Sequence, residues 1–238
     1  MALRGIDTAI ASAHPVLLDA LGTLVTFAPP APRLRDLLAE RHAVAVTEAE
    51  AAAAMRAEIA FYRREHDRAR DRPALAALRR DCAAVLRDAL PAAAHAIDVD
   101  ALTPTLLDAI RFEPFPEVPA VLDELRARGH PLAVVSNWDV SLHDVLDLTG
   151  LADRVDVVVT SAELGAAKPS AAPFRAALEA LGAAPAGALH AGDTVAEDVD
   201  GARAAGITPV LVDRDGAGEA PAGVAVVADL KGLLRIAA

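Results

Sequence analysis

The chain has few cysteines, aromatic residues and basic residues, and each of these scarcities excludes a kind of site, core or partner. Cys82 is the single cysteine, so an internal disulfide is excluded and a zinc site built on paired cysteines is excluded with it. It falls at an apolar position of a helical pattern, which indicates a small core residue. Aromatic residues make up only 3% of the 238 residues, so we expect a core built mainly from alanine, valine and leucine.

Positive charge is also scarce, with 23 lysines and arginines against 34 acidic residues and a net charge of −11. Nucleic acids and anionic membranes attract basic patches, so we expect neither as a partner. No apolar run approaches the roughly 18 residues of a membrane span, and residues 1–15 contain Arg4 and Asp7, unlike a signal peptide. These features predict a cytoplasmic protein that acts on a small molecule, and they leave its oligomeric state open.

What the chain has in abundance is apolar residues, at 54%, in alternating strand-like and helical segments. Strands are predicted at residues 16–19, 132–135, 156–160, 187–191 and 208–212. Helices are predicted at residues 118–128, 141–149, 172–181 and 196–205. This alternation predicts an α/β fold, a Rossmann-like parallel sheet flanked by helices.

A long helical block interrupts the alternation from about residue 33 to 111. Its apolar positions recur at helical spacing in residues 47–66, from Pro73 to Leu86, and near residues 100–110. The linker 112–116, which contains two prolines, closes the block. We therefore predict an α/β core domain of residues 1–28 and 113–238 and an inserted all-helical cap domain of residues 29–112. Because the insertion leaves the core just past Asp19, we expect it to lie over that residue.

Polar residues follow four of the predicted strands. They are Asp19, then Ser136 and Asn137, then Lys168, and finally Asp193 and Asp198. Parallel sheets bind ligands beyond the carboxyl ends of their strands, so we expect these side chains to share one crevice. A carboxylate nucleophile with nearby donors and a cation is suited to phosphoryl transfer. Magnesium binds one or two carboxylates together with phosphate oxygens.

These segments occur in the order of a known family's motifs: Asp19–Thr23, Ser136–Asp139, Lys168–Pro169 and the stretch Gly192–Gly206. With them the chain resembles the haloacid dehalogenase-like hydrolase superfamily, in the subgroup with a helical cap inserted after the first motif. The resemblance covers nearly the whole chain.

The resemblance implies a nucleophile and a metal site. Asp19 would form an aspartyl intermediate with the substrate. Mg²⁺ would be bound by Asp19, the carbonyl of Leu21 and Asp193, and Asp198 would support the metal directly or through water.

The remaining motif residues would act on the phosphoryl group. The resemblance implies that Ser136 and Thr23 contact this group and that Lys168 neutralises charge on nucleophile and substrate. Asn137, next to Ser136 in the same motif, is predicted to belong to the catalytic set.

Leu21 departs from the pattern of the phosphatases in this superfamily. The residue two beyond the nucleophile is usually an aspartate that protonates the leaving alcohol and later activates water. Leucine cannot transfer a proton, and losing a positioned acid typically costs about 10²–10⁴-fold in rate.

Three interpretations stay open, and the first is favoured. The protein is a magnesium-dependent phosphatase that acts on a small phosphorylated metabolite through an aspartyl-phosphate. Its substrate then has a good leaving group, or His190, Glu197 or a cap residue supplies the proton.

In the second interpretation the protein is a 2-haloacid dehalogenase, because a halide leaving group needs no acid. Asp193 and Asp198 weigh against it, since dehalogenases need no metal. In the third, the protein is a weakly active or non-catalytic binding protein, which the presence of Asp19, Lys168 and Asp193 weighs against.

A polar cluster within the insertion is the candidate for substrate contact. It consists of Tyr62, Arg63, Arg64 and His66. The same residues would also fit a solvated helix face.

Overall fold

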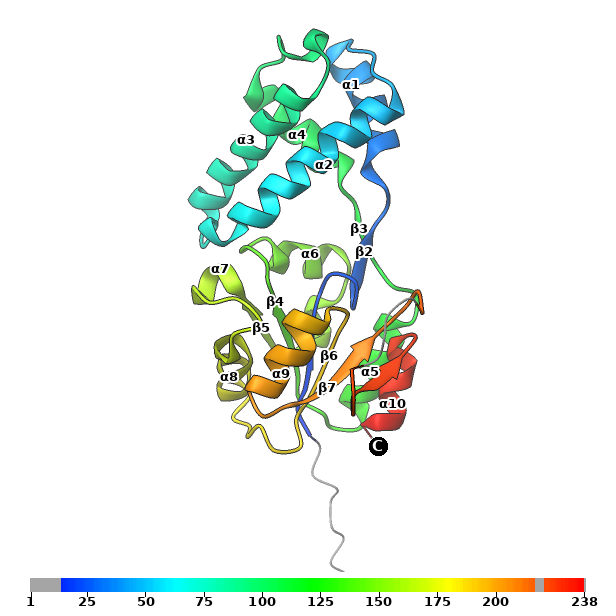
Figure 1. Cartoon of the computed structure of the whole chain (residues 1–238), viewed down its shortest axis with the longest axis vertical. Coiled ribbons are helices and arrows are strands. Elements are labelled where there is room, and N and C mark those ends of the chain that lie inside the picture. The colour runs from blue at the N-terminus through cyan, green and yellow to red at the C-terminus, as the bar shows by residue number, and fades with distance from the viewer. Residues whose placement is uncertain (1–13, 217–220, 238) are drawn as a thin grey trace, which may run out of the picture.

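A six-stranded parallel sheet forms the centre of the computed structural model, which describes residues 14–216 and 221–237 (Figure 1). The strand order is β5-β4-β1-β6-β7-β8. The strands are β1 (Val16–Leu18), β4 (Leu132–Ser136), β5 (Val157–Thr160), β6 (Leu189–Gly192), β7 (Thr208–Val212) and β8 (Ala225–Val227). The predicted α/β fold with a parallel sheet is confirmed, and β1 lies between β4 and β6 at its centre.

Helices cover both faces of the sheet. On one face lie α5 (Val118–Ala127), α6 (Leu142–Leu148) and α10 (Leu233–Ile236), and on the other α8 (Ala171–Ala180) and α9 (Asp200–Ala204). Successive side chains of a strand point to opposite faces. Accordingly Val16 and Leu18 pack with α5 and α6, whereas Leu17 packs with α8. The short helix α7 (Ser161–Leu164) directly follows β5.

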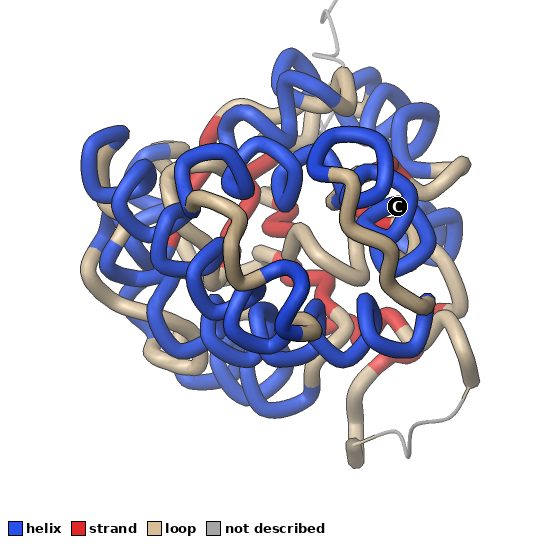
Figure 2. The backbone as a smooth tube through the Cα atoms, turned by 90° about the horizontal axis from the view of Figure 1, so that it is seen from above, coloured by secondary structure: helices blue, strands red, loops and turns tan. Residues whose placement is uncertain are grey.

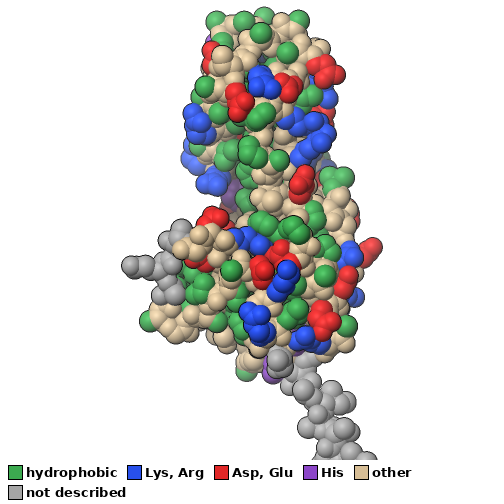
Figure 3. Space-filling model, turned by 90° about the vertical axis from the view of Figure 1, so that its right-hand side faces the viewer, with side chains coloured by type: hydrophobic (Ala, Val, Ile, Leu, Met, Phe, Trp, Pro, Cys, Tyr) green, Lys and Arg blue, Asp and Glu red, His purple; other side chains and the backbone are tan. Residues whose placement is uncertain are grey.

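Four helices between β1 and β4 form a separate lobe above the sheet (Figures 1 and 3). They are α1 (Pro30–His42), α2 (Glu48–Glu65), α3 (Arg72–Ala89) and α4 (Val99–Ala109), packed around their own apolar core. Seen from above, helices surround the strands (Figure 2). On the face drawn in Figure 3, basic and acidic side chains are interspersed over both lobes.

Local sequence signals set where the helices of the insertion begin. The Thr47 side chain accepts from the Glu50 amide, and the Glu50 side chain accepts from the Thr47 amide, a capping box that starts α2. The carboxylates of Asp71 and Asp98 accept backbone amides at the starts of α3 and α4.

Two short antiparallel strands, β2 (Val25–Phe27) and β3 (Phe112–Pro114), lead into and out of the insertion. Phe27 pairs with Phe112 across this hairpin. The sequence predicts only a proline-containing linker here, because these three-residue strands contain polar residues and are too short for a period-two pattern to be recognised. β1 is equally short but wholly apolar and is predicted, whereas β8 is not.

The predicted helix at residues 196–205 is interrupted. A π-helical turn, Val195–Val199, precedes α9, and the Val199 amide donates to the Thr194 carbonyl five residues before it. This wider turn lets the Asp198 carboxylate accept the Thr194 amide at 3.0 Å. Among the helices in the described part of the chain, none is long and apolar enough to cross a membrane.

Candidate active site

Asp19 lies at the carboxyl end of β1, between the ends of β4 and β6. Its Oδ1 accepts a hydrogen bond from Ser136 Oγ at 3.0 Å and one from Lys168 Nζ at 2.6 Å. Both donors hold the same oxygen, so Asp19 Oδ2 receives no hydrogen bond from any described residue. The carboxylate is therefore fixed in orientation while one oxygen stays available.

Lys168 is a buried cation that bridges two carboxylates. Its Nζ lies 2.6 Å from Asp19 Oδ1 and 2.6 Å from Asp198 Oδ1, and the residue is only 4% exposed. Burial alone would lower the pKa of Lys168, but the charges of Asp19 and Asp198 raise it above its usual value. The lysine therefore stays protonated and balances the charge of Asp19.

Asp198 is buried and is held by three hydrogen-bond donors. It accepts from Lys168 Nζ at 2.6 Å, from His190 Nε2 at 2.9 Å and from the Thr194 amide at 3.0 Å. Burial favours a higher pKa for Asp198, but the hydrogen bond from His190 and the charge of Lys168 hold it well below the usual range. With three donors bound, Asp198 is placed to orient Lys168.

His190 does not face the crevice. Its ring is fully buried in β6, packs edge-on against Phe174 at 4.8 Å, and bonds Asp198 through Nε2. Within the described chain Nδ1 has no hydrogen-bond partner. The sequence leaves His190 open as a proton donor to the leaving group, but in this position it supports Asp198 instead.

Three carboxylates are close enough together to hold a cation. Asp19, Asp193 and Asp198 each offer an oxygen, and these oxygens lie within 4.8 Å of one another. Burial raises the pKa of Asp193 to about 6, and the charges of Asp19 and Asp198 add to this rise. A cation would remove that repulsion, and carboxylate oxygens are the ligands that Mg²⁺ takes.

Gly22 makes room for this carboxylate cluster. Its φ is +84°, and a Cβ at this position would lie 2.1 Å from Asp193 Oδ2. Any other residue would therefore clash with Asp193 and strain the backbone. None of the described residues donates a hydrogen bond to the neighbouring Leu21 carbonyl, which agrees with the predicted place of that oxygen in a metal site.

Asn137 connects the loops around the lysine. Its Oδ1 accepts the Lys168 amide at 2.7 Å, and its Nδ2 donates to the Lys168 carbonyl and to Glu197 Oε2, both at 3.0 Å. These contacts place Asn137 where it positions Lys168. They also engage Glu197, the second proton donor that the sequence leaves open.

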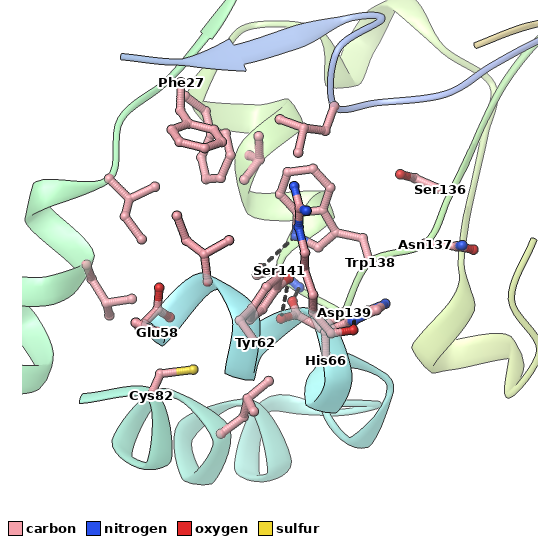
Figure 4. Close-up of a pocket in the computed structure, with 18 of the residues that line it drawn as sticks. Phe27, Glu58, Tyr62, His66, Cys82, Ser136, Asn137, Trp138, Asp139 and Ser141 are labelled. Carbon is pink, nitrogen blue, oxygen red and sulfur yellow. Dashed lines mark hydrogen bonds between the residues drawn. The ribbon is translucent and has the colours of Figure 1, made fainter. Parts of the chain in front are cut away.

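A cavity of about 670 Å³ opens between this cluster and the insertion (Figure 4). Asp19, Ser136 and Asp193 line it from the core, and Leu21 is part of the same wall. The opposite wall comes from the insertion, where Glu58 and the buried Cys82 lie far from Ser136 (Figure 4). The insertion therefore bounds the space in which a substrate would meet Asp19.

The polar cluster predicted in the insertion divides in two. Tyr62, Arg63 and His66 line the cavity. Arg64 does not, because its Nη1 donates to the Ala60 carbonyl and its guanidinium lies over the Phe61 ring.

Thr23 also lies away from the cavity. It is fully buried, and its Oγ1 has no hydrogen-bond partner among the described residues. The predicted contact between Thr23 and a phosphoryl group would therefore need this loop to move.

Arg214 is a residue of the site that the sequence does not reveal. From the loop after β7 it donates to the carbonyls of Gly22 at 3.0 Å and Thr23 at 2.8 Å. Its guanidinium also lies 2.9 Å from Glu117 Oε1 and 3.4 Å from the centroid of the Phe115 ring. It thus fixes the turn that follows Asp19 from nearly 200 residues further along the chain, where no local motif marks it.

The insertion is attached to the core at a second place besides the β2/β3 hairpin. Tyr62 OH donates to Asp139 Oδ2 at 3.0 Å, and Arg72 pairs with Asp144 through two hydrogen bonds, the longer one 2.7 Å. The Val140 amide donates to the Ala69 carbonyl at 3.1 Å. The turn between α2 and α3 therefore rests on the loop after β4.

Comparisons with known proteins agree with this geometry. A family model described as haloacid dehalogenase-like hydrolase matches residues 16–206. A phosphoserine phosphatase of Thermus thermophilus is 43% identical over 105 residues, which are 44% of this chain and 42% of that protein. The chain matches only about half the length of the curated relatives, or less.

Solved structures match over more of the chain. A HAD phosphatase from Thermococcus onnurineus superposes with a TM-score of 0.63 and 26% identity, covering 94% of this chain and 97% of that one. The L-2-haloacid dehalogenase RSc1362 superposes with a TM-score of 0.65 at 24% identity, covering 95% and 99%, a likeness of fold alone. The family match runs from the start of β1 to just past α9, and on that ground this chain belongs to the haloacid dehalogenase-like hydrolases.

Proposed function

We propose that the protein is a magnesium-dependent phosphatase that hydrolyses a small phosphomonoester through an aspartyl-phosphate at Asp19. The observation that carries this proposal is the state of the Asp19 carboxylate. Lys168 and Ser136 hold Oδ1, while Oδ2 is free of hydrogen bonds from described residues, and an oxygen of Asp19 lies within 4.8 Å of a carboxylate oxygen of Asp193. A family of hydrolases whose named relatives include phosphatases supports the same class of reaction.

In the proposed first step, an Asp19 oxygen forms a bond to phosphorus while the bond from phosphorus to the leaving oxygen breaks. Lys168 balances negative charge at the nucleophile, and the Ser136 hydroxyl is placed to donate to a phosphoryl oxygen once the carboxylate reacts. In the second step water attacks phosphorus, phosphate leaves, and the Asp19 carboxylate is restored. An acyl phosphate is a reactive mixed anhydride with a carboxylate as its leaving group, so this step needs less help than the first.

The proposed metal would be held by Asp19, Asp193 and the Leu21 carbonyl, with Asp198 acting through Lys168 and the Thr194 turn. Bound Mg²⁺ supplies charge neutralisation at the phosphoryl oxygens. The fit rests on the three clustered carboxylates and on the space that Gly22 leaves for Asp193. We further propose that the helical insertion acts as a cap that encloses the substrate.

A dehalogenase is the second candidate, and Leu21 is the observation that favours it. A leucine at this position removes the acid that an alcohol needs and a halide does not. Against it stands Asp193: Lys168 balances the charges of Asp19 and Asp198, but no cation among the described residues pairs with Asp193, whose charge a metal-free reaction would leave unbalanced.

Phosphate release from acetyl phosphate and phenyl phosphate, measured with Mg²⁺ and with a chelator, tests the proposal. We expect release with Mg²⁺ and its loss on chelation. Asp19→Asn should lower it by at least about 10³-fold, whereas Asp147→Asn, an exposed aspartate on α6, should not change it. Halide release from 2-chloropropionate that persists in chelator, without phosphate release, would establish the dehalogenase instead.

A further inference from the structure

The cavity wall beside Asp19 is aromatic, although aromatic residues are rare in this chain. The sequence has five phenylalanines, one tyrosine and one tryptophan, and four of these rings line the cavity. They are Phe27, Tyr62, Phe112 and Trp138. A chance distribution would not concentrate scarce rings in this one space.

Three of these rings form a continuous surface. Phe112 packs edge-on against Phe27 with ring centroids 6.0 Å apart, and it packs at a tilt against Trp138 with centroids 5.2 Å apart. Phe27 and Phe112 are paired across the β2/β3 hairpin, and Trp138 stands two residues after Ser136. In Figure 4 the ring of Trp138 lies between Phe27 and Ser136. An aromatic surface thus starts next to the group predicted to contact phosphate.

Leu21 continues this surface towards the nucleophile. It lines the cavity, packs against the apolar core and lies two residues after Asp19. The side chain two residues after Asp19 is therefore apolar and cannot give a proton to a leaving oxygen.

Two polar groups of the cavity wall already have hydrogen-bond partners. Tyr62 donates to Asp139, and Asn137 binds the Lys168 loop and Glu197. The other polar groups of the wall include Glu58, His66 and Arg79, all from the insertion, and His66 Nε2 has no hydrogen-bond partner among the described residues.

From these two observations, the aromatic wall and Leu21, we infer that the substrate is the phosphomonoester of an aromatic alcohol whose oxygen is attached to the ring. This inference rests on the proposed phosphatase function and names its substrate class. Aromatic rings attract one another in edge-on and offset arrangements. A phenol ionises near pH 10, about as tyrosine does, so a phenolate leaves without protonation far more readily than an aliphatic alkoxide.

The inference has two parts, that the leaving oxygen is phenolic and that the leaving group carries an aromatic ring. Four phosphate compounds test these parts separately. Phenyl and benzyl phosphate share a ring but differ in the basicity of the leaving oxygen. Benzyl phosphate and glycerol 1-phosphate share an aliphatic leaving oxygen but differ in the ring. Acetyl phosphate, with a good leaving group and no ring, reports phosphoryl transfer alone.

The expected order of kcat/KM with Mg²⁺ is phenyl, then benzyl, then glycerol phosphate. Phenyl phosphate should exceed benzyl phosphate by at least about 10²-fold, the scale of a missing acid. Benzyl phosphate should exceed glycerol 1-phosphate by roughly tenfold through burial of the ring. Phe112→Leu should lower the benzyl-to-glycerol ratio, whereas Phe61→Leu, on the same lobe but outside the cavity wall, should leave it unchanged.

The outcomes distinguish a failure of the inferred substrate class from a failure of the proposed phosphatase function. Hydrolysis of acetyl phosphate with glycerol phosphate preferred over benzyl phosphate, or with phenyl no faster than benzyl, overturns the substrate class and leaves the phosphatase standing. No hydrolysis of any of the four compounds overturns the proposed function and this inference together.

Discussion

At the scale of single residues, the account depends on what stands two positions after the nucleophile. Aspartate and asparagine match each other in size and share the branching of leucine, so two variants at this position can differ in acidity alone. Leu21→Asp should raise hydrolysis of benzyl phosphate by about 10²-fold or more by supplying a proton, and should raise phenyl phosphate hydrolysis much less. Leu21→Asn is the matched control, because it adds polarity without an acid. Equal rates for the two variants would show that proton delivery does not limit this enzyme.

Arg214 gives a second residue-scale prediction. Its planar fork binds the Gly22 and Thr23 carbonyls together, a geometry that a lysine cannot reproduce. Arg214→Lys should lower kcat roughly tenfold through misplacement of the Asp19 turn, with a smaller effect on KM. Arg128→Lys is the control, since Arg128 also donates to a carbonyl, that of Leu234, and pairs with Glu124. A fall in thermal stability with kcat unchanged would reduce Arg214 to a purely structural role.

The sequence could predict the residues at the strand ends but not their supports. Asp19, Ser136 and Asp193 each follow a buried apolar run, and a parallel sheet necessarily brings such positions together. Arg214 and the place of His190 behind Asp198 depend on contacts between distant segments, for which no local pattern exists. For this reason the sequence leaves His190 open as one of several proton donors to the leaving group, whereas the structure buries it in β6.

At the scale of elements, the α2–α3 turn and the loop after β4 hold the insertion against the core. Burial raises the pKa of Tyr62, and the adjacent Asp139 carboxylate raises it further, so the hydroxyl is a neutral donor. Asp139 is 1% exposed, and removing the donor leaves a buried carboxylate oxygen without its partner. Contacts of this kind should keep the cavity closed on the side away from the β2/β3 hairpin.

Tyr62→Phe tests this attachment. We expect a loss of about 1–3 kcal/mol in the free energy of unfolding, measured by urea denaturation, together with a raised KM as the lobe loosens. A double-mutant cycle with Asp139→Asn should give a coupling energy well above zero. Additive effects in that cycle would mean that the hydrogen bond does not hold the two parts together.

The longer elements and the wholly apolar β1 follow from sequence pattern, and the other three-residue strands do not. α2 and α3 begin at side-chain caps and carry helical periodicity over 18 residues each. β2, β3 and β8 are three residues long and form only because partner strands and packing select them. The π-helical turn before α9 likewise accompanies a specific contact, the hydrogen bond from the Thr194 amide to the Asp198 carboxylate, which helix propensity does not predict.

At the scale of the whole molecule, clustered negative charge should make stability depend on metal. The raised pKa of Asp193 means that its ionised form is disfavoured in the metal-free fold. That penalty is absent below pH 4, grows as pH rises, and is complete above about pH 6. A protein with a net charge of −11 should therefore gain stability when Mg²⁺ occupies this cluster.

Thermal unfolding at pH 7.5 checks this dependence. Saturating Mg²⁺ should raise Tm, since about 100-fold excess over Kd adds about 2.7 kcal/mol to the free energy of unfolding. Asp193→Asn should raise Tm in chelator by removing the repulsion and should abolish the further gain from Mg²⁺. Asp147→Asn should retain the wild-type response to Mg²⁺. A Mg²⁺ response that survives in Asp193→Asn would place the cation elsewhere.

The central claim is that Asp19 carries the phosphoryl group during turnover, and trapping that intermediate tests it most directly. The enzyme is mixed with Mg²⁺ and phenyl phosphate, quenched in acid within one turnover, digested and analysed by mass spectrometry. The account predicts one added phosphoryl group on the peptide that contains Asp19, and its absence in Asp19→Asn. Phosphate release with no adduct at Asp19, or with an adduct on another residue, would contradict it.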